Sequence, residues 1–299
     1  METQATVKEH VVPKFYWKKF SDDKGFLCVY DRIKQVFFPT TPDDFLYRKN
    51  AYETKWENAD ERWGDFVLHN HLEKEFGKRE NCFNALLEKA LERCARGNNK
   101  ECILDVSEKE LFAEMVSNIY LRNPDVMRAL FPDGSDYRTM ELYEGVATLF
   151  DICGWGSPES LFEHAEKEGI FALQLEDSPI RVMMRDLQKM SLTFYTTKKV
   201  RFMTSSKPVL IKSEKQRMYI VFPMSPHVVA LFTDNERFAS IDNTTREIED
   251  SDAIRINQLR FLSEPNEEQY LVARDRHSFD GLPYVESTIT NMALEAHII

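Results

Sequence analysis

The segment from Val200 to Phe232 constrains the fold of this chain more than any other part of the sequence. It contains three short apolar runs, rich in Val, Ile, Phe and Tyr, that are separated by small polar residues and proline. Runs of this length bounded by turn residues are typical of buried β-strands. We therefore expect neighbouring strands here. Two polar stretches, Thr204 to Pro208 and Pro223 to His227, are expected at the strand ends, where binding sites are commonly built.

Two further strand patterns occur near the N-terminus, at residues 26–30 and 35–38. The polar residues 31–34 between them predict a hairpin. An aromatic cluster precedes the hairpin with the spacing of a short helix, and packing into the core is its simplest interpretation. Its members are Phe15, Tyr16, Trp17 and Phe20.

The middle of the chain predicts helices. Apolar residues recur at three- and four-residue steps from Leu68 to Leu91, and Gly97 follows as a helix terminator. Residues 105–108 offer caps for a second helix that ends at Arg122, and residues 125–190 predict further short helices. Residues 234–252 are expected to form an exposed loop with a short hairpin, residues 253–262 a helix, and residues 269–272 a last strand.

This order of strands, helices and strands predicts an α+β fold in a single domain. An N-terminal hairpin occupies residues 7–50, a helical part residues 66–190, and a strand-rich part residues 198–275. The strand-rich part is expected to form a mixed or antiparallel sheet.

Composition limits the compartment and the partners. The chain has no apolar N-terminal leader, no run of eighteen apolar residues, and five cysteines without a CxxC pair, so we expect a cytoplasmic protein with reduced thiols and no membrane span. The net charge of −11 repels phosphate backbones on average, so nucleic-acid binding would need a local basic patch. The best basic segments with interleaved aromatic residues are 14–20 and 198–202.

No P-loop, dinucleotide-binding, zinc-protease or nucleophile-elbow motif is present. Glu73 and Glu80 are seven residues apart, which places both on one face of a helix. Two carboxylates on one face can bind a divalent metal or act as acid and base. The alternative is a solvated face, because the same helix is rich in Lys and Glu.

Four more polar residues are candidates for a site, and each has a simpler structural interpretation. His10 can act as a base or ligand, or as a surface residue near a terminus. Arg122 can clamp an anion, or bind the last carbonyls of its own helix. His227 follows a strand end. Asn257 lies in an apolar helix and must form hydrogen bonds if it is buried.

These residues lie within a series of short motifs that together resemble the bacterial family known as domain of unknown function 4238. Residues 10–20 are similar to the family's HxxPxFYLxxF opening, and residues 27–32, Tyr47 and residues 122–124 follow in the family's order. Glu73 and Glu80 correspond to a paired-glutamate helix. Residues 203–209 are similar to a TSDxPV element, residues 222–226 to FPLSP, and Asn257 to a late Asn. Ser206 departs from the pattern, because the family usually has Asp there.

Polar residues at the motif positions are expected near the predicted strand ends, and two functions are open. In the first, the chain is a nuclease-like hydrolase or effector in an antiphage-defence or toxin setting, with catalytic residues His10, Glu73, Glu80 and Arg122. Nucleic acid is then the expected substrate, and a divalent metal, of unknown identity, a candidate cofactor. In the second, the chain is a non-catalytic binding or sensor module for a protein partner, and the same polar residues form a structural network. The candidate binding residues are Thr204, Ser205, Ser206, His227 and Asn257.

Overall fold

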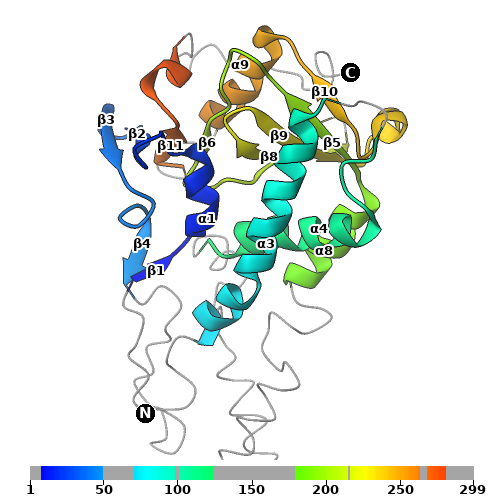
Figure 1. Ribbon diagram of the computed structural model, residues 1–299, viewed down its shortest axis with the longest axis horizontal. Coiled ribbons are helices and arrows are strands. Elements are labelled where there is room, and N and C mark those ends of the chain that lie inside the picture. Colours follow the sequence, from blue (N-terminus) through cyan, green and yellow to red (C-terminus); the bar gives the residue numbers. More distant parts are fainter. Residues whose placement is uncertain are drawn as a thin grey trace, which may run out of the picture.

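The computed structural model of the chain describes residues 8–49, 71–97, 101–123, 179–214, 216–262 and 268–280 (Figure 1). Within these ranges both helices and sheets are present, and the predicted α+β class is confirmed. The short helices expected between residues 125 and 178 lie outside the described residues. No helix in the described ranges is long and apolar enough to cross a membrane.

The larger sheet has five strands in the order β10-β5-β9-β8-β7. β10 pairs with β5 in parallel and the other pairs are antiparallel, so this sheet is mixed. The strands are β5 (Ser191–Thr196), β7 (Leu210–Glu214), β8 (Arg217–Ser225), β9 (Val228–Thr233) and β10 (Thr245–Glu247).

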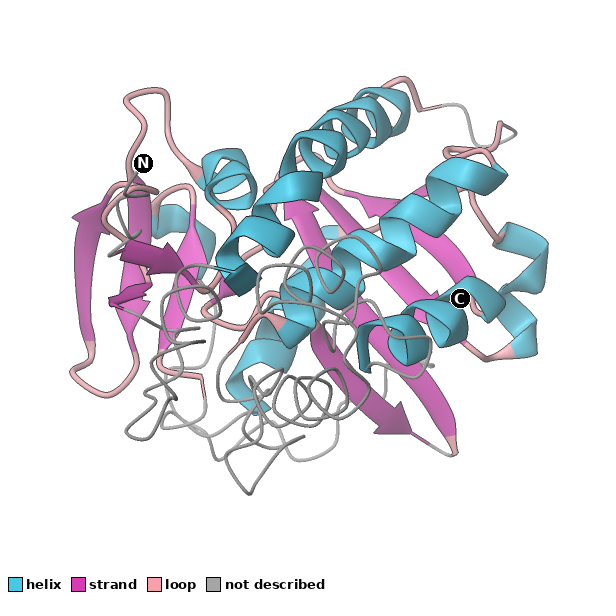
Figure 2. Cartoon of the chain, turned by 90° about the horizontal axis from the view of Figure 1, so that it is seen from below, coloured by secondary structure: helices cyan, strands magenta, loops and turns pink. Residues whose placement is uncertain are grey.

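Both faces of this sheet are buried. Along β8, Ile220, Phe222 and Met224 pack into one apolar cluster, whereas Tyr219 and Val221 pack into another. The first cluster includes apolar residues of three helices, α3 (His71–Ala95), α4 (Val106–Leu121) and α8 (Pro179–Lys189). The second includes α9 (Asp250–Gln258). Figure 2 shows helices lying across one face of this sheet. A strand buried on both sides carries a continuous apolar run, which explains the sequence pattern of β8 and β9.

The predicted N-terminal hairpin is confirmed, and it pairs with the C-terminal part of the chain. β2 (Leu27–Asp31) and β3 (Val36–Thr40) belong to an antiparallel sheet of order β3-β2-β11-β6, with β11 (Tyr270–Ala273) and β6 (Thr204–Ser205). The segment that begins at Val200 therefore supplies strands to both sheets. A small third sheet joins β1 (Lys8–His10) to β4 (Tyr47–Lys49).

Local signals explain the helix ends. α3 is followed by Gly97 at φ +68°, a left-handed conformation that glycine adopts without strain. α4 begins with a capping box, in which the Asp105 carboxylate accepts from the Glu108 N–H and the Glu108 carboxylate accepts from the Asp105 N–H. The aromatic cluster near residue 17 forms α1 (Lys14–Trp17) and the 3₁₀ turn η1 (Lys18–Phe20), and its rings are buried as predicted.

Two parts of the larger sheet differ from the sequence prediction. β5, a central strand, was not predicted, because SLTFYT is a short run with only three apolar residues. The stretch expected to be an exposed loop with a hairpin instead forms the 3₁₀ helix η2 (Glu236–Ile241), which buries Phe238, and then β10, which pairs with β5. The remaining short elements are the 3₁₀ helices η3 (Leu259–Leu262) and η4 (Arg276–Phe279).

Candidate functional site

His10 is buried at the end of β1, opposite Tyr47 of β4. The centres of the two rings are 6.3 Å apart. The ring atom Nε2 lies 3.3 Å from the backbone oxygen of Asp43. A carbonyl oxygen can only accept a hydrogen bond, so Nε2 carries the proton and, in the neutral ring, Nδ1 carries the lone pair.

The surroundings of His10 favour this neutral form. Burial lowers the pKa of the imidazole below its ordinary value of 6.5, and the nearby charge of Lys14 lowers it further. The hydrogen bond to Asp43 opposes these effects, and the charge of Arg122 adds to the lowering. At neutral pH His10 is therefore an uncharged imidazole within reach of the charges of two cationic side chains, Lys14 and Arg122.

Arg122 follows the last turn of α4, and only 1% of its surface is exposed. Its Nη1 donates to the carboxylate of Glu80 on α3, and the side chain of Glu80 is 29% exposed. The guanidinium thus joins two helices by an ion pair that is buried on one side and reaches water on the other. We call these three side chains the His10–Glu80–Arg122 cluster.

Of the four predicted catalytic residues, Glu80 and Arg122 are in direct contact, and the charge of Arg122 reaches His10. Glu73 lies on α3 two turns before Glu80, so its backbone position is on the same face, but its side chain lies outside the described residues. Among the side chains that are described, no group of three His, Cys, Asp or Glu residues is arranged to hold a metal ion.

The candidate binding residues of β6 belong to a separate buried network. The hydroxyl of Tyr16 donates to the backbone oxygen of Pro223 at 2.7 Å. It lies 2.6 Å from Oγ1 of Thr204, which must be the donor in that contact because the single Tyr16 proton is already used. One phenol thus ties α1 to both sheets.

Ser205 belongs to the same buried region. Its hydroxyl binds the carboxylate of Glu268, and Glu268 forms an ion pair with Arg260. Arg260 also donates to the backbone oxygens of Lys207 and Pro208, which fixes the chain that leaves β6. Ser206, where the family usually has Asp, is half-buried in this bend, and its N–H donates to the oxygen of Tyr270.

The other two candidate binding residues contact backbone groups. Asn257 is buried, its Oδ1 accepts from the N–H of Met203, and its Nδ2 donates to the oxygen of Arg201. This pair of bonds holds α9 against the segment that leads into β6. His227 is exposed in the turn between β8 and β9, where its Nδ1 lies 3.2 Å from the oxygen of Thr197.

Sequence reasoning did not identify the charged residues Arg32, Arg260 and Glu268 as members of a buried network. Arg32 donates to the backbone oxygens of Arg260 and Glu268. Two signals were available in the sequence. Arg260 lies within the apolar stretch IRINQLRFL, in which Asn257 alone was singled out, and Arg32 ends the motif of residues 27–32.

No curated protein and no solved structure matches the chain. A family model does match, over residues 8–276, which is nearly the whole sequence. This range contains both the His10–Glu80–Arg122 cluster and the Tyr16 network. The chain therefore belongs to the family described as protein of unknown function (DUF4238).

Proposed function

We propose that the His10–Glu80–Arg122 cluster is the active site of a hydrolase that cleaves a phosphate ester, of the nuclease-like class. One observation carries the proposal: a buried imidazole held neutral lies close to the charge of a buried guanidinium. A neutral base next to a fixed cation suits attack by water on an anionic substrate.

The residues would act as follows. Arg122, oriented by Glu80, binds the non-bridging phosphate oxygens and stabilises the charge that develops on them. Nδ1 of His10 takes a proton from water as the new P–O bond forms. The bond to the leaving oxygen breaks, and the imidazolium returns that proton to the leaving oxygen. Lys14, whose Nζ lies 2.8 Å from Oδ1 of Asp43, adds a further positive charge.

Nucleic acid is the polymeric substrate that fits this class, and an antiphage-defence or toxin setting fits the family resemblance. A divalent metal stays a candidate cofactor of this class of reaction, since carboxylate oxygens and imidazole are usual metal ligands.

A second function, a non-catalytic binding module, is favoured by the ion pair itself. Arg122 and Glu80 connect α4 to α3, which is what a purely structural pair would do. The amide of Asn257, which is bonded through both its oxygen and its nitrogen, and the buried Thr204 and Ser205 fit the same interpretation for the other network.

The test is hydrolysis of bis(p-nitrophenyl) phosphate and of labelled DNA and RNA oligonucleotides, with Mg²⁺, Mn²⁺, Zn²⁺ or a chelator. His10→Gln is the decisive variant, because the glutamine amide can still donate to Asp43 but provides no basic lone pair. Glu92→Gln is the matched control for Glu80→Gln, because Glu92 lies on the same helix in an exposed ion pair with Arg96. The proposal requires cleavage that His10→Gln and Glu80→Gln reduce and Glu92→Gln does not.

A further inference from the structure

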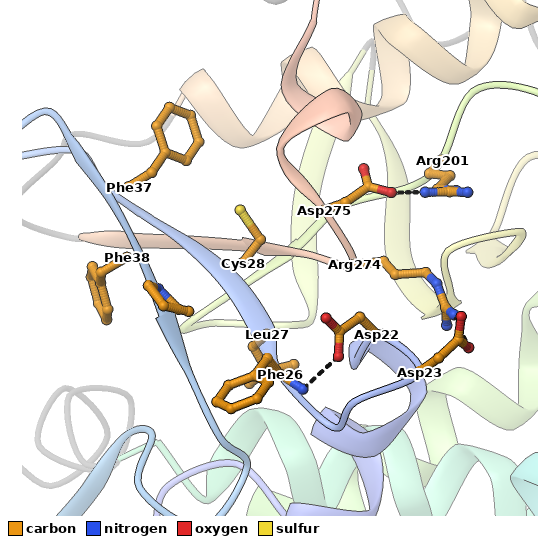
Figure 3. Close-up of a pocket in the computed structure, with 11 residues that line it drawn as sticks. Asp22, Asp23, Phe26, Leu27, Cys28, Phe37, Phe38, Arg201, Arg274 and Asp275 are labelled. Carbon is orange, nitrogen blue, oxygen red and sulfur yellow. Dashed lines mark hydrogen bonds and ion pairs between the residues drawn. The ribbon is translucent and has the colours of Figure 1, made fainter.

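A cavity of about 470 Å³ lies beside the start of β2 and the end of β3 (Figure 3). Its lining includes Phe26, Cys28, Phe37, Arg201, Arg274 and Asp275. None of its lining residues belongs to the His10–Glu80–Arg122 cluster. The volume is in the range of pockets that bind small molecules.

One side of the cavity is apolar. Phe26 is 43% exposed, which leaves a large ring open to water at the rim. Phe37 is half-buried, and the guanidinium of Arg276 lies 4.9 Å from the centre of its ring. Burial raises the pKa of the Cys28 thiol, so this group is neutral at neutral pH. This side of the cavity therefore offers an uncharged surface to a planar ring.

The other side carries a guanidinium that is already held in place. Nη1 of Arg274 donates to the backbone oxygen of Ser21 at 2.8 Å, and Nη2 is paired with the carboxylate of Asp23. The side chain of Asp23 is 95% exposed. An ion pair to such an exposed carboxylate contributes little, because water screens it and the side chain loses entropy when it is fixed. An incoming anion can therefore replace Asp23 on Arg274.

The neighbouring acids are more firmly held. The Asp22 carboxylate accepts from the N–H groups of Lys24 and Phe26 and so closes its own turn. Asp275 pairs with Arg201 and also accepts from the N–H and hydroxyl of Ser278. Asp23 is thus the carboxylate that an incoming anion can displace most easily from its cationic partner.

We propose that this cavity binds a nucleoside monophosphate, with the base against Phe26 and the phosphate on Arg274 in place of Asp23. The assignment rests on the pairing of an exposed aromatic ring with a pre-positioned guanidinium in one cavity of suitable size. A second cavity of about 480 Å³ shares the lining residues Arg201 and Asp275 with the first and adds Lys199. The site is independent of the proposed hydrolytic cluster.

Calorimetric titration of the full chain with AMP, adenosine, ribose 5-phosphate and inorganic phosphate tests the proposal. AMP should bind at least tenfold more tightly than any of the other three. Phe26→Ala should weaken AMP binding about tenfold, the size expected for loss of one base–aromatic stack. Phe26 is exposed, so this variant should fold.

Asp23→Asn should change the affinity for AMP in the opposite direction. It removes the competing carboxylate from Arg274, and AMP should bind several-fold more tightly. Asp186→Asn is the matched control, because it makes the same change of charge at an exposed ion pair with Lys189 on α8. The proposal is overturned if AMP does not bind, if both Asp variants have the same effect, or if phosphate alone binds as tightly as AMP.

Discussion

His10 at the end of β1 lies close enough to Arg122 at the end of α4 that the guanidinium charge helps to lower the pKa of the imidazole. The first residue ends a strand near the N-terminus, and the second follows a helix more than a hundred residues later in the sequence. Arg122 is in turn held by Glu80 of α3. A strand end and two helices thus place a neutral base, a fixed cation and a carboxylate in one region.

The lowered pKa of His10 predicts a defined dependence of stability on pH. The unfolded chain protonates this histidine below pH 6.5, whereas the folded chain does so only at lower pH. In the window between these two values the unfolded state binds more protons, so the free energy of unfolding rises with pH. Urea unfolding at a series of pH values should show this rise, and His10→Gln should flatten it. An equal slope in both proteins would contradict the burial of a neutral His10.

The ion pair between Arg122 and Glu80 predicts an asymmetric effect on stability. Glu80→Gln removes the carboxylate that faces a buried guanidinium, and breaking a buried pair in this way costs about 3 kcal/mol. Glu92→Gln on the same helix should cost less than about 0.5 kcal/mol, because its pair with Arg96 is exposed. Chemical denaturation measures both values. Similar losses in the two variants would show that the pair of Glu80 with Arg122 stabilises the fold no more than an exposed ion pair does.

The hydroxyl of Tyr16 predicts a coupling between distant parts of the chain. Tyr16→Phe leaves the Pro223 oxygen and the Thr204 hydroxyl without this partner, which should cost about 2 kcal/mol. Thr204→Val should cost less once Tyr16 is already Phe. A double-mutant cycle in thermal or urea unfolding measures the coupling. If the two losses are strictly additive, a direct hydrogen bond between Tyr16 and Thr204 is excluded.

Asn257 should matter for stability without taking part in catalysis. Asn257→Leu leaves the Met203 N–H and the Arg201 oxygen unpaired in a buried place, which should cost about 2 kcal/mol or more. At a temperature where the variant is folded, the rate of hydrolysis should equal that of the natural chain. A rate loss in a fully folded variant would place Asn257 in the site.

The sequence predicted the elements whose signals are local. β8 and β9 carry continuous apolar runs, β2 and β3 flank a polar turn, and α4 has a complete capping box. It did not predict β5 or β10. Their pairing joins residues 194 and 245, and nothing in the short sequence TRE indicates a strand. The sequence also gave no indication that β6 and β7 belong to different sheets.

The candidate site was predictable only in part for the same reason. His10, Glu80 and Arg122 could each be singled out by residue type and by the family resemblance. Their arrangement depends on β1 pairing with β4 and on α3 packing against α4, which are long-range contacts. The hydrogen-bond partners of Tyr16 could not be predicted for the same reason, since 188 residues separate it from Thr204. Local sequence patterns therefore identify candidate residues more readily than they identify the residues that contact them in the fold.

The most direct test of the central claim is the rate of phosphodiester hydrolysis by the natural chain and by His10→Gln, measured from pH 5 to 9 with each metal and with a chelator. We expect cleavage by the natural chain. We also expect the rate to fall by about 10² to 10⁴ in His10→Gln, the size expected for loss of a general base, with the unfolding temperature retained above pH 7. Equal rates in the two proteins, or no cleavage by the natural chain under any of these conditions, would contradict it and leave the binding module as the function.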